Sequence, residues 1–163
     1  MNFLPISLLS RRTFSVRLVL AAVACVVICG HQHAVQGAPS ETDGQVAARE
    51  IALEMAGAFT NDGYKIRDGH WTGQLKLKEP RILTVNLYAG NQYYFSLGST
   101  DKAKKVNVTV YDEAGKQVGD ELFFQDRFRA AAGVSPVASG PYYVSIQLLE
   151  GEPTDFCLLY SYK

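Results

Sequence analysis

Few residues in this chain of 163 amino acids could perform acid–base or nucleophilic catalysis. A hydrolase of the serine type needs a nucleophile held beside a histidine base. His70 could pair with a distant serine such as Ser135 or Ser139, but nothing in their spacing favours such a pair. Cys157 lies in an apolar run, where a buried and unreactive thiol is the usual outcome. The sequence therefore predicts a protein that is not an enzyme, with a hydrolase using His70 as the minor alternative.

Metal ligands and phosphate-binding side chains are also sparse. A calcium site needs six or more converging oxygens, whereas the aspartates are spread over separate turns, at Asp101, Asp112, Asp120 and Asp126. Phosphate binding needs clustered basic residues, and the nearest approach to a cluster is a solvated loop holding Lys102, Lys104 and Lys105. We therefore expect no cofactor, no metal and no nucleic-acid partner, and the sequence gives calcium no specific support.

Aromatic side chains are the best candidates for binding a ligand. By strand alternation, four tyrosines point away from the predicted core: Tyr88, Tyr94, Tyr111 and Tyr143. Rings on a flat sheet face stack on sugar rings or on proline-rich chains with little loss of conformational entropy. The alternative is that these tyrosines stabilise cross-strand neighbours or lie under a helix. Trp71 is a fifth candidate, with a plug over one end of the fold as its structural alternative.

Residues 1–37 are expected to be a signal peptide rather than part of the fold. Three arginines precede a 12-residue apolar run at residues 18–29, which is too short to span a bilayer. The run SRRTF at residues 10–14 resembles a twin-arginine signal, and an ordinary secretory signal explains it equally well. A lipoprotein signal ending at Cys25 is a third and minor alternative. All three predict export, to the periplasm or the extracellular space.

The chain beyond this segment is expected to form one domain. It contains 13 basic and 16 acidic residues, because the three arginines of the signal are removed. Cys157 is its only cysteine, so no intramolecular disulfide is available and the domain must depend on its hydrophobic core.

Alternation of apolar and polar residues indicates that this domain is all-β. Residues 81–98, RILTVNLYAGNQYYFSLG, contain two alternating runs around a short turn, which predicts a β-hairpin. Further alternating runs at 106–111, 142–148 and 156–162, with weaker ones between, suggest an antiparallel β-sandwich or jelly roll of seven or eight strands.

One amphipathic helix is expected before the strands. TDGQ at residues 42–45 has the pattern of a capping box, and Ala47, Ile51, Met55 and Phe59 recur at the spacing of a helix face. Asn61 and Gly63 predict its end. Its small residues suggest close packing against its own sheet or against a neighbouring chain.

The order of these motifs resembles the bacterial pre-peptidase C-terminal domain. The resemblance covers residues 71–162 and is carried by GQL at 73–75, LTVNLYAG at 83–90, YYFSL at 93–97, the strand and turn at 106–115, SGPYYV at 139–144 and the closing strand at 156–160. It implies a jelly-roll-like sandwich of a kind usually appended to exported enzymes, some relatives of which bind collagen, polysaccharide or calcium. Here the N-terminal extension is a helix rather than an acidic linker, and no binding residue of the family is carried over.

Together these observations predict a secreted, non-catalytic module at the bacterial cell envelope. The expected partner is a polysaccharide or protein of the envelope or matrix, recognised by the tyrosine-bearing sheet face. The alternative is a structural or assembly protein whose N-terminal helix docks on a partner chain. The domain organisation is then a signal peptide at 1–37, a polar segment with helix and connector at 38–70, and the sandwich at 71–163.

Overall fold

The computed structural model describes residues 40–119 and 124–163. The signal-peptide prediction, including its Cys25 alternative, lies outside these residues, as does Asp120. The described elements are one helix and ten strands: α1 (Asp43–Thr60), β1 (Lys65–Ile66), β2 (Trp71–Leu75), β3 (Arg81–Leu87), β4 (Tyr93–Ser99), β5 (Ala103–Tyr111), β6 (Gln117–Val118), β7 (Phe124–Asp126), β8 (Arg129–Val134), β9 (Gly140–Gly151) and β10 (Thr154–Tyr162).

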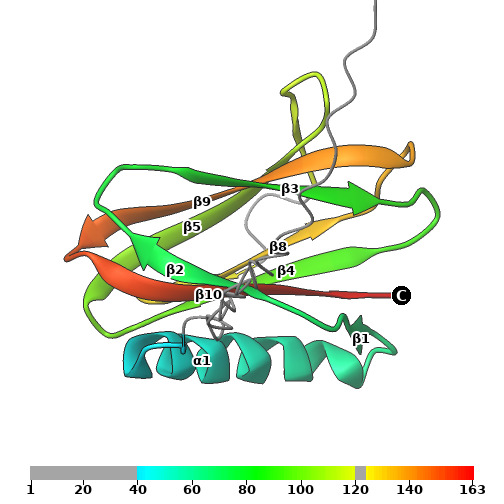
Figure 1. Ribbon diagram of the computed structural model, residues 1–163. Helices are drawn as coiled ribbons and strands as arrows, with labels where there is room; N and C mark the ends of the chain where they lie inside the picture. Colours follow the sequence, from blue (N-terminus) through cyan, green and yellow to red (C-terminus); the bar gives the residue numbers. More distant parts are fainter. Residues whose placement is uncertain (1–39, 120–123) are drawn as a thin grey trace, which may run out of the picture. The chain divides into compact units, whose positions relative to one another are not determined.

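The strands form two antiparallel sheets packed face to face (Figure 1). One sheet has the order β1-β10-β4-β8-β7, with β2 paired to β10 beside β1, and the other has the order β3-β9-β5-β6. The all-β sandwich with one helix is therefore confirmed. The described residues contain ten strands rather than seven or eight. The number differs from the prediction because β1, β6 and β7 are only two or three residues long, which is too short to show alternation.

The predicted alternation places the apolar side chains of both sheets in one shared interior. Among the largest fully buried side chains there are Phe95, Leu97, Val108, Val110, Ile146, Leu148, Phe156 and Leu158. Val144 is also fully buried, so all three of the long alternating runs contribute to the core as expected.

The segment 81–98 is not a hairpin, contrary to the sequence prediction. Among the described strands, β3 pairs with β9 while β4 pairs with β10 and β8, so residues 88–92 pass from one sheet to the other. Gly90 adopts the expected left-handed conformation, with a φ of 90°. Alternation buries Val85 and Phe95 in the same interior whether their strands pair or face each other, so the pattern alone does not distinguish the two arrangements.

Helix α1 lies on the outer face of the six-stranded sheet, over β4 and β10 (Figure 1). Its capping box is present: the backbone N–H of Gln45 donates to the Thr42 hydroxyl, and the Gln45 side chain accepts from the Thr42 N–H. The buried face consists of Ala48, Ala52, Ala56 and Phe59, whereas Ala47 and Ala58 are exposed. The buried face thus shares Phe59 with the predicted stripe and otherwise lies directly beside it, about one position further round the helix, with Ile51 and Met55 half-buried.

This face differs from the predicted one because the helix packs through its smallest residues. A Cβ atom built on Gly98 of β4 would lie 2.3 Å from the Ala48 carbonyl oxygen and 2.7 Å from the Ala52 nitrogen. The alanine face and Gly98 thus allow the backbones of helix and strand to approach each other closely. The Ile51 Cβ would lie 3.1 Å from the same built atom, so Ile51 borders this contact, and the helix packs on its own sheet.

Candidate functional site

The sandwich is open along the side where β3 borders one sheet and β1 and β2 border the other. Two adjoining hollows, of about 240 and 350 Å³, share Arg67, Asn86, Tyr88 and Tyr160 in their walls. One is completed by Trp71, Thr84 and Val85, and the other by Asn91, Tyr93 and Tyr162. We call this combined surface the aromatic groove, because five of its ten lining residues are tyrosine or tryptophan.

Tyr93 fixes one wall of the aromatic groove. Its hydroxyl oxygen accepts hydrogen bonds from the Tyr88 backbone N–H at 3.0 Å and from the Asn91 side-chain amide at 3.1 Å. The Ala89 N–H donates to the Ser139 hydroxyl at 2.9 Å, which ties the same loop to the start of β9. These bonds hold the loop that follows β3, and they leave the Tyr88 side chain 63% exposed at the mouth of the groove.

Tyr160 forms the floor and is enclosed by other groups. The Trp71 ring stacks on it with 6.2 Å between ring centroids and an interplanar angle of 24°, and Tyr93 meets it edge-on at 5.8 Å. The Arg67 guanidinium lies 5.3 Å above the same ring, within cation–π range. Burial raises the pKa of Tyr160, so its hydroxyl stays protonated at neutral pH. Tyr160 is only 7% exposed, so the floor is a packed set of rings that supports the wall residues, and the most exposed ring is that of Tyr88.

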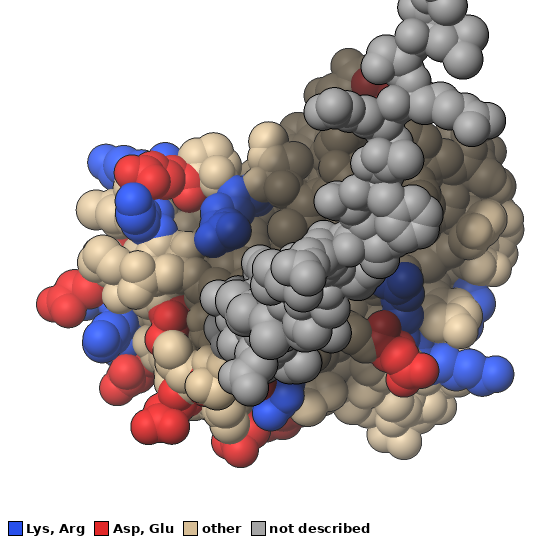
Figure 2. Space-filling view, in the orientation of Figure 1, with Lys and Arg blue, Asp and Glu red and all other residues tan. Residues whose placement is uncertain are grey.

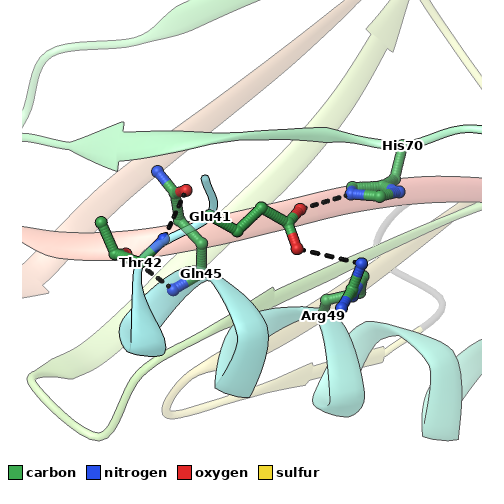
Figure 3. Close-up of polar contacts among 5 residues, drawn as sticks. All are labelled: Glu41, Thr42, Gln45, Arg49 and His70. Atoms are coloured by element: carbon green, nitrogen blue, oxygen red, sulfur yellow. Dashed lines mark hydrogen bonds and ion pairs between the residues drawn. The ribbon is translucent and has the colours of Figure 1, made fainter. Parts of the chain in front are cut away.

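The connector that carries Arg67 and Trp71 is anchored at both ends. At its first end, the Arg67 backbone N–H donates a hydrogen bond to the Tyr160 carbonyl oxygen at 3.0 Å. At the other end, His70 Nε2 lies 2.6 Å from one Glu41 oxygen, and the other Glu41 oxygen receives the Arg49 guanidinium at 2.9 Å (Figure 3). Glu41 directly precedes the helix N-cap, so the start of α1 is linked to the residue before Trp71.

The groove presents ring faces, side-chain amides and one guanidinium. Among the described residues that line it, Arg67 is the only charged one, and none is a carboxylate. A pair of positioned carboxylates, or a nucleophile beside a base, is what hydrolysis would require. The lining residues supply neither, and their chemistry is that of stacking and hydrogen bonding.

The structure brings together two of the five predicted binding residues, Tyr88 and Trp71. Tyr111 and Tyr143 face each other across β5 and β9 on the outer face of the four-stranded sheet, where both are half-buried. Tyr94 does lie outside the core, but beneath the helix: its ring stacks on Phe59 at 4.3 Å and an interplanar angle of 6°. The five residues therefore do not form the single face that alternation suggested.

Four residues of the groove, Arg67, Asn86, Tyr93 and Tyr160, are not among the predicted binding residues. Tyr93 and Tyr160 are in phase with the core positions of their strands and are themselves buried, so they resemble ordinary core residues in the sequence. They border a groove only because β1 and β2 end the sheet beside them. The one available signal was the spacing of Arg67 and Trp71 around Gly69, in a connector too polar to be core.

The residues considered for catalysis lie elsewhere and apart from one another. The hydrogen bond and ion pair of His70 are with Glu41, and no hydroxyl of a described serine is bonded to it. Cys157 is fully buried beneath the alanine face of α1, and this burial raises the pKa of its thiol to about 12. Within residues 40–119 and 124–163, no three histidine, cysteine or acidic side chains are grouped as metal ligands.

A larger hollow of about 410 Å³ lies between the end of α1 and β8. Its walls include Met55 and Phe59 of the helix and Ala131 of β8, with Glu54, Asp62 and Arg129 at its polar edge. Phe59 stacks on Tyr94, and Arg129 pairs with Asp126 at 2.9 Å. This hollow offers fewer exposed rings than the aromatic groove, which is therefore the better candidate site.

Charged side chains are mixed in sign on the surface. On the face in view in Figure 2, lysine, arginine and acidic residues lie among one another at the end that carries the β9–β10 turn. In the part of the chain that the structure describes, no helix is both long and apolar enough to cross a membrane.

Comparison with known proteins assigns no family. No model of a protein family matches the chain, and no curated protein matches its sequence significantly. The resemblance to the pre-peptidase C-terminal domain therefore stays a prediction, and the chain is placed by its architecture alone, as a two-sheet antiparallel sandwich with one helix packed on an outer face.

Proposed function

We propose that this protein is an exported, non-catalytic binding module that recognises a polysaccharide of the bacterial cell envelope or matrix through the aromatic groove. The observation that carries the proposal is the meeting of Trp71, Tyr88 and Tyr160 with Asn86 and Arg67 in one preformed groove. Sugar rings have apolar faces that stack on aromatic side chains and hydroxyl groups that bond to amides and guanidinium groups. The export part of the proposal rests on the sequence of residues 1–37.

A polysaccharide suits this groove better than a folded protein partner does. The groove is concave and narrow, whereas a stable protein interface buries about 800 Å² on each partner around a fully desolvated centre. The polar groups of the groove are amides and hydroxyls spaced among rings, which fits a ligand that alternates apolar faces and hydroxyl groups. An assembly role for α1 has less support, because the alanine face of the helix is buried on its own sheet.

The test is affinity electrophoresis of the purified protein through gels containing neutral or acidic soluble polysaccharides. Tyr88→Ala removes the most exposed ring of the groove, and we expect it to weaken binding at least tenfold, or about 1.4 kcal/mol. Matched controls are Tyr111→Ala and Tyr143→Ala, which remove tyrosines from the flat sheet face. Circular dichroism of each variant verifies that the fold is intact.

The outcomes separate the two possible surfaces. Loss of retardation in Tyr88→Ala alone supports the groove. Loss in Tyr143→Ala with normal retardation of Tyr88→Ala would move the site to the flat face. A wild-type protein that is not retarded by any polymer of either kind would refute the proposed function.

A further inference from the structure

Among the described residues that line the aromatic groove, one carries a charge, and it is positive. Arg67 belongs to both hollows, and the other nine described lining residues have side chains without a formal charge. The rest of the domain is weakly acidic overall, so this local charge is not part of a generally basic surface. A negatively charged ligand at this point would be attracted by Arg67, and no acidic residue among the described lining residues would oppose it.

Arg67 differs from the arginines that stabilise the fold. Arg49 pairs with Glu41 at 2.9 Å and Arg129 pairs with Asp126 at 2.9 Å, whereas Arg67 forms no ion pair with a carboxylate of the described residues. Its guanidinium lies over the Tyr160 ring instead. This cation–π contact restrains the position of the guanidinium, which lowers the conformational entropy that would be lost when a ligand binds to its N–H groups.

We propose that the ligand of the groove is an acidic polysaccharide, and that Arg67 binds a carboxylate of one sugar residue while Tyr88 stacks on a ring of the chain. This inference rests on the proposed function and specifies its ligand. A guanidinium presents paired N–H donors that match the two oxygens of a carboxylate. Tyr88 and Arg67 line the same two hollows, so one ligand can engage both.

Hydroxyl groups of the polysaccharide have amide partners in the same walls. The Asn86 side chain is on an exposed residue of β3 and makes no hydrogen bond with a described residue, so both its donor and acceptor groups are available. Asn91 uses its NH₂ group on the Tyr93 hydroxyl, which leaves its carbonyl oxygen as an acceptor. The groove thus combines one anion-binding group, ring faces and unused amide groups.

An extended peptide is the other ligand that this side of the sandwich could receive. Among the described strands β3 is an edge strand, and Thr84, Val85 and Asn86 line the groove consecutively. A peptide added to that edge would be held mainly by main-chain hydrogen bonds and would need side-chain pockets at every second residue. The walls offer ring faces and amides rather than such pockets, so an acidic polysaccharide is favoured.

The experiment measures affinity for three polyuronates, polygalacturonate, alginate and hyaluronate, and for their carboxyl-reduced, neutral counterparts. We expect the wild-type protein to bind at least one polyuronate and to bind its neutral counterpart at least tenfold more weakly. Arg67→Gln should weaken binding to the polyuronate at least tenfold and binding to the neutral polymer by a much smaller factor, because only the polyuronate loses a charge-assisted pair. Arg67→Lys should retain part of the affinity, because it keeps the charge without the paired donors.

Arg127→Gln is the matched control, since Arg127 is an exposed arginine in the β7–β8 turn, outside the groove. It should bind like the wild type, and thermal denaturation of each variant establishes that the fold is retained.

Equal loss of affinity in Arg67→Gln and Arg127→Gln would show nonspecific charge attraction and overturn the inference. If the wild type binds acidic and neutral polymers equally and Tyr88→Ala abolishes binding to both, the inference about charge is overturned. The proposed function would then still stand. Binding to none of the polymers overturns both, and an interaction retained only by extended peptides would assign the groove to that ligand class.

Discussion

Gly98 is the position where the contact between helix and sheet can be tested most sharply. Its φ lies outside the left-handed region, so alanine can adopt the backbone conformation without strain. Alanine is also no worse than glycine in a strand interior, and strand propensity alone would predict that Gly98→Ala stabilises the protein. Packing predicts the opposite, because the new Cβ would lie 2.3 Å from the Ala48 carbonyl oxygen and 2.7 Å from the Ala52 nitrogen.

The size of the effect follows from how far the helix would have to move. Cβ atoms are essentially never found closer than 3.0 Å to such neighbours, and both neighbours here belong to helix backbone that cannot rotate away. Lifting α1 by about 1 Å would forfeit a quarter to a half of the dispersion energy of each alanine contact. Overpacking of a core usually costs about 1–3 kcal/mol, and we expect Gly98→Ala to reach the upper part of this range, about 3 kcal/mol. For a domain of this size that lowers Tm by roughly 10 °C.

Gly57 provides the matched control, because it is a glycine of α1 with no atom within 4 Å of its added Cβ. Gly57→Ala should stabilise the helix by about 0.5–1 kcal/mol and raise Tm by a few degrees. Both variants are measured by urea and thermal unfolding, followed by circular dichroism. If Gly98→Ala has the Tm of the wild type or a higher one, α1 does not lie against β4 as described, and the explanation of its alanine face is wrong.

Two further predictions concern the same interface. The Ser96 hydroxyl is fully buried on β4 without a hydrogen-bond partner among the described residues. Ser96→Ala should therefore leave the free energy of unfolding unchanged or raise it by up to about 1 kcal/mol. If urea unfolding instead shows that this free energy falls by more than about 1 kcal/mol, the hydroxyl forms a hydrogen bond at that site. Cys157 should not react with iodoacetamide at pH 8 in the folded protein and should react readily in urea, because burial raises the pKa of its thiol to about 12. Because folding raises this pKa, the contribution of the protonated thiol to the free energy of unfolding is complete below the unfolded-state pKa of 9.0 and is lost as the pH rises toward 12. The urea midpoint should therefore fall over that pH interval. A thiol that reacts equally fast in the folded and unfolded protein would contradict both expectations.

The interior of the sandwich was predictable because strand burial has a period of two residues. The alternating runs at 81–98, 106–111 and 142–148 predict that one side of each strand is buried, and Val85, Phe95, Val108 and Val144 of these runs lie in the core. The pattern does not identify which strands pair, so the segment from β3 to β4 was interpreted as a hairpin although its strands belong to different sheets. Pairing is decided by contacts between distant segments, such as β3 with β9, which local periodicity does not encode.

The helix and the candidate site show where a single sequence is insufficient. The capping box predicted the start of α1 correctly, but the buried face depended on Gly98, which lies 38 residues beyond the end of the helix. Alternation identified Tyr88 as outward-facing, yet it also selected Tyr94, because it contains no information about which sheet face a helix covers. The sequence pattern does not single out Tyr160, because a core position beside the gap between β1 and β2 has the same alternation as any other core position of β10.

The loop at residues 88–92 joins one sheet to the other, and its hydrogen bonds to Tyr93 and Ser139 reach both layers. The proposed ligand, held by Tyr88 on one side and by Arg67 and Tyr160 on the other, would contact residues associated with both sheets. Binding would then oppose separation of the two layers, so that the bound ligand raises the unfolding temperature in proportion to the logarithm of its concentration above Kd. The module would thereby become most resistant to unfolding and proteolysis while it is attached to its polymer.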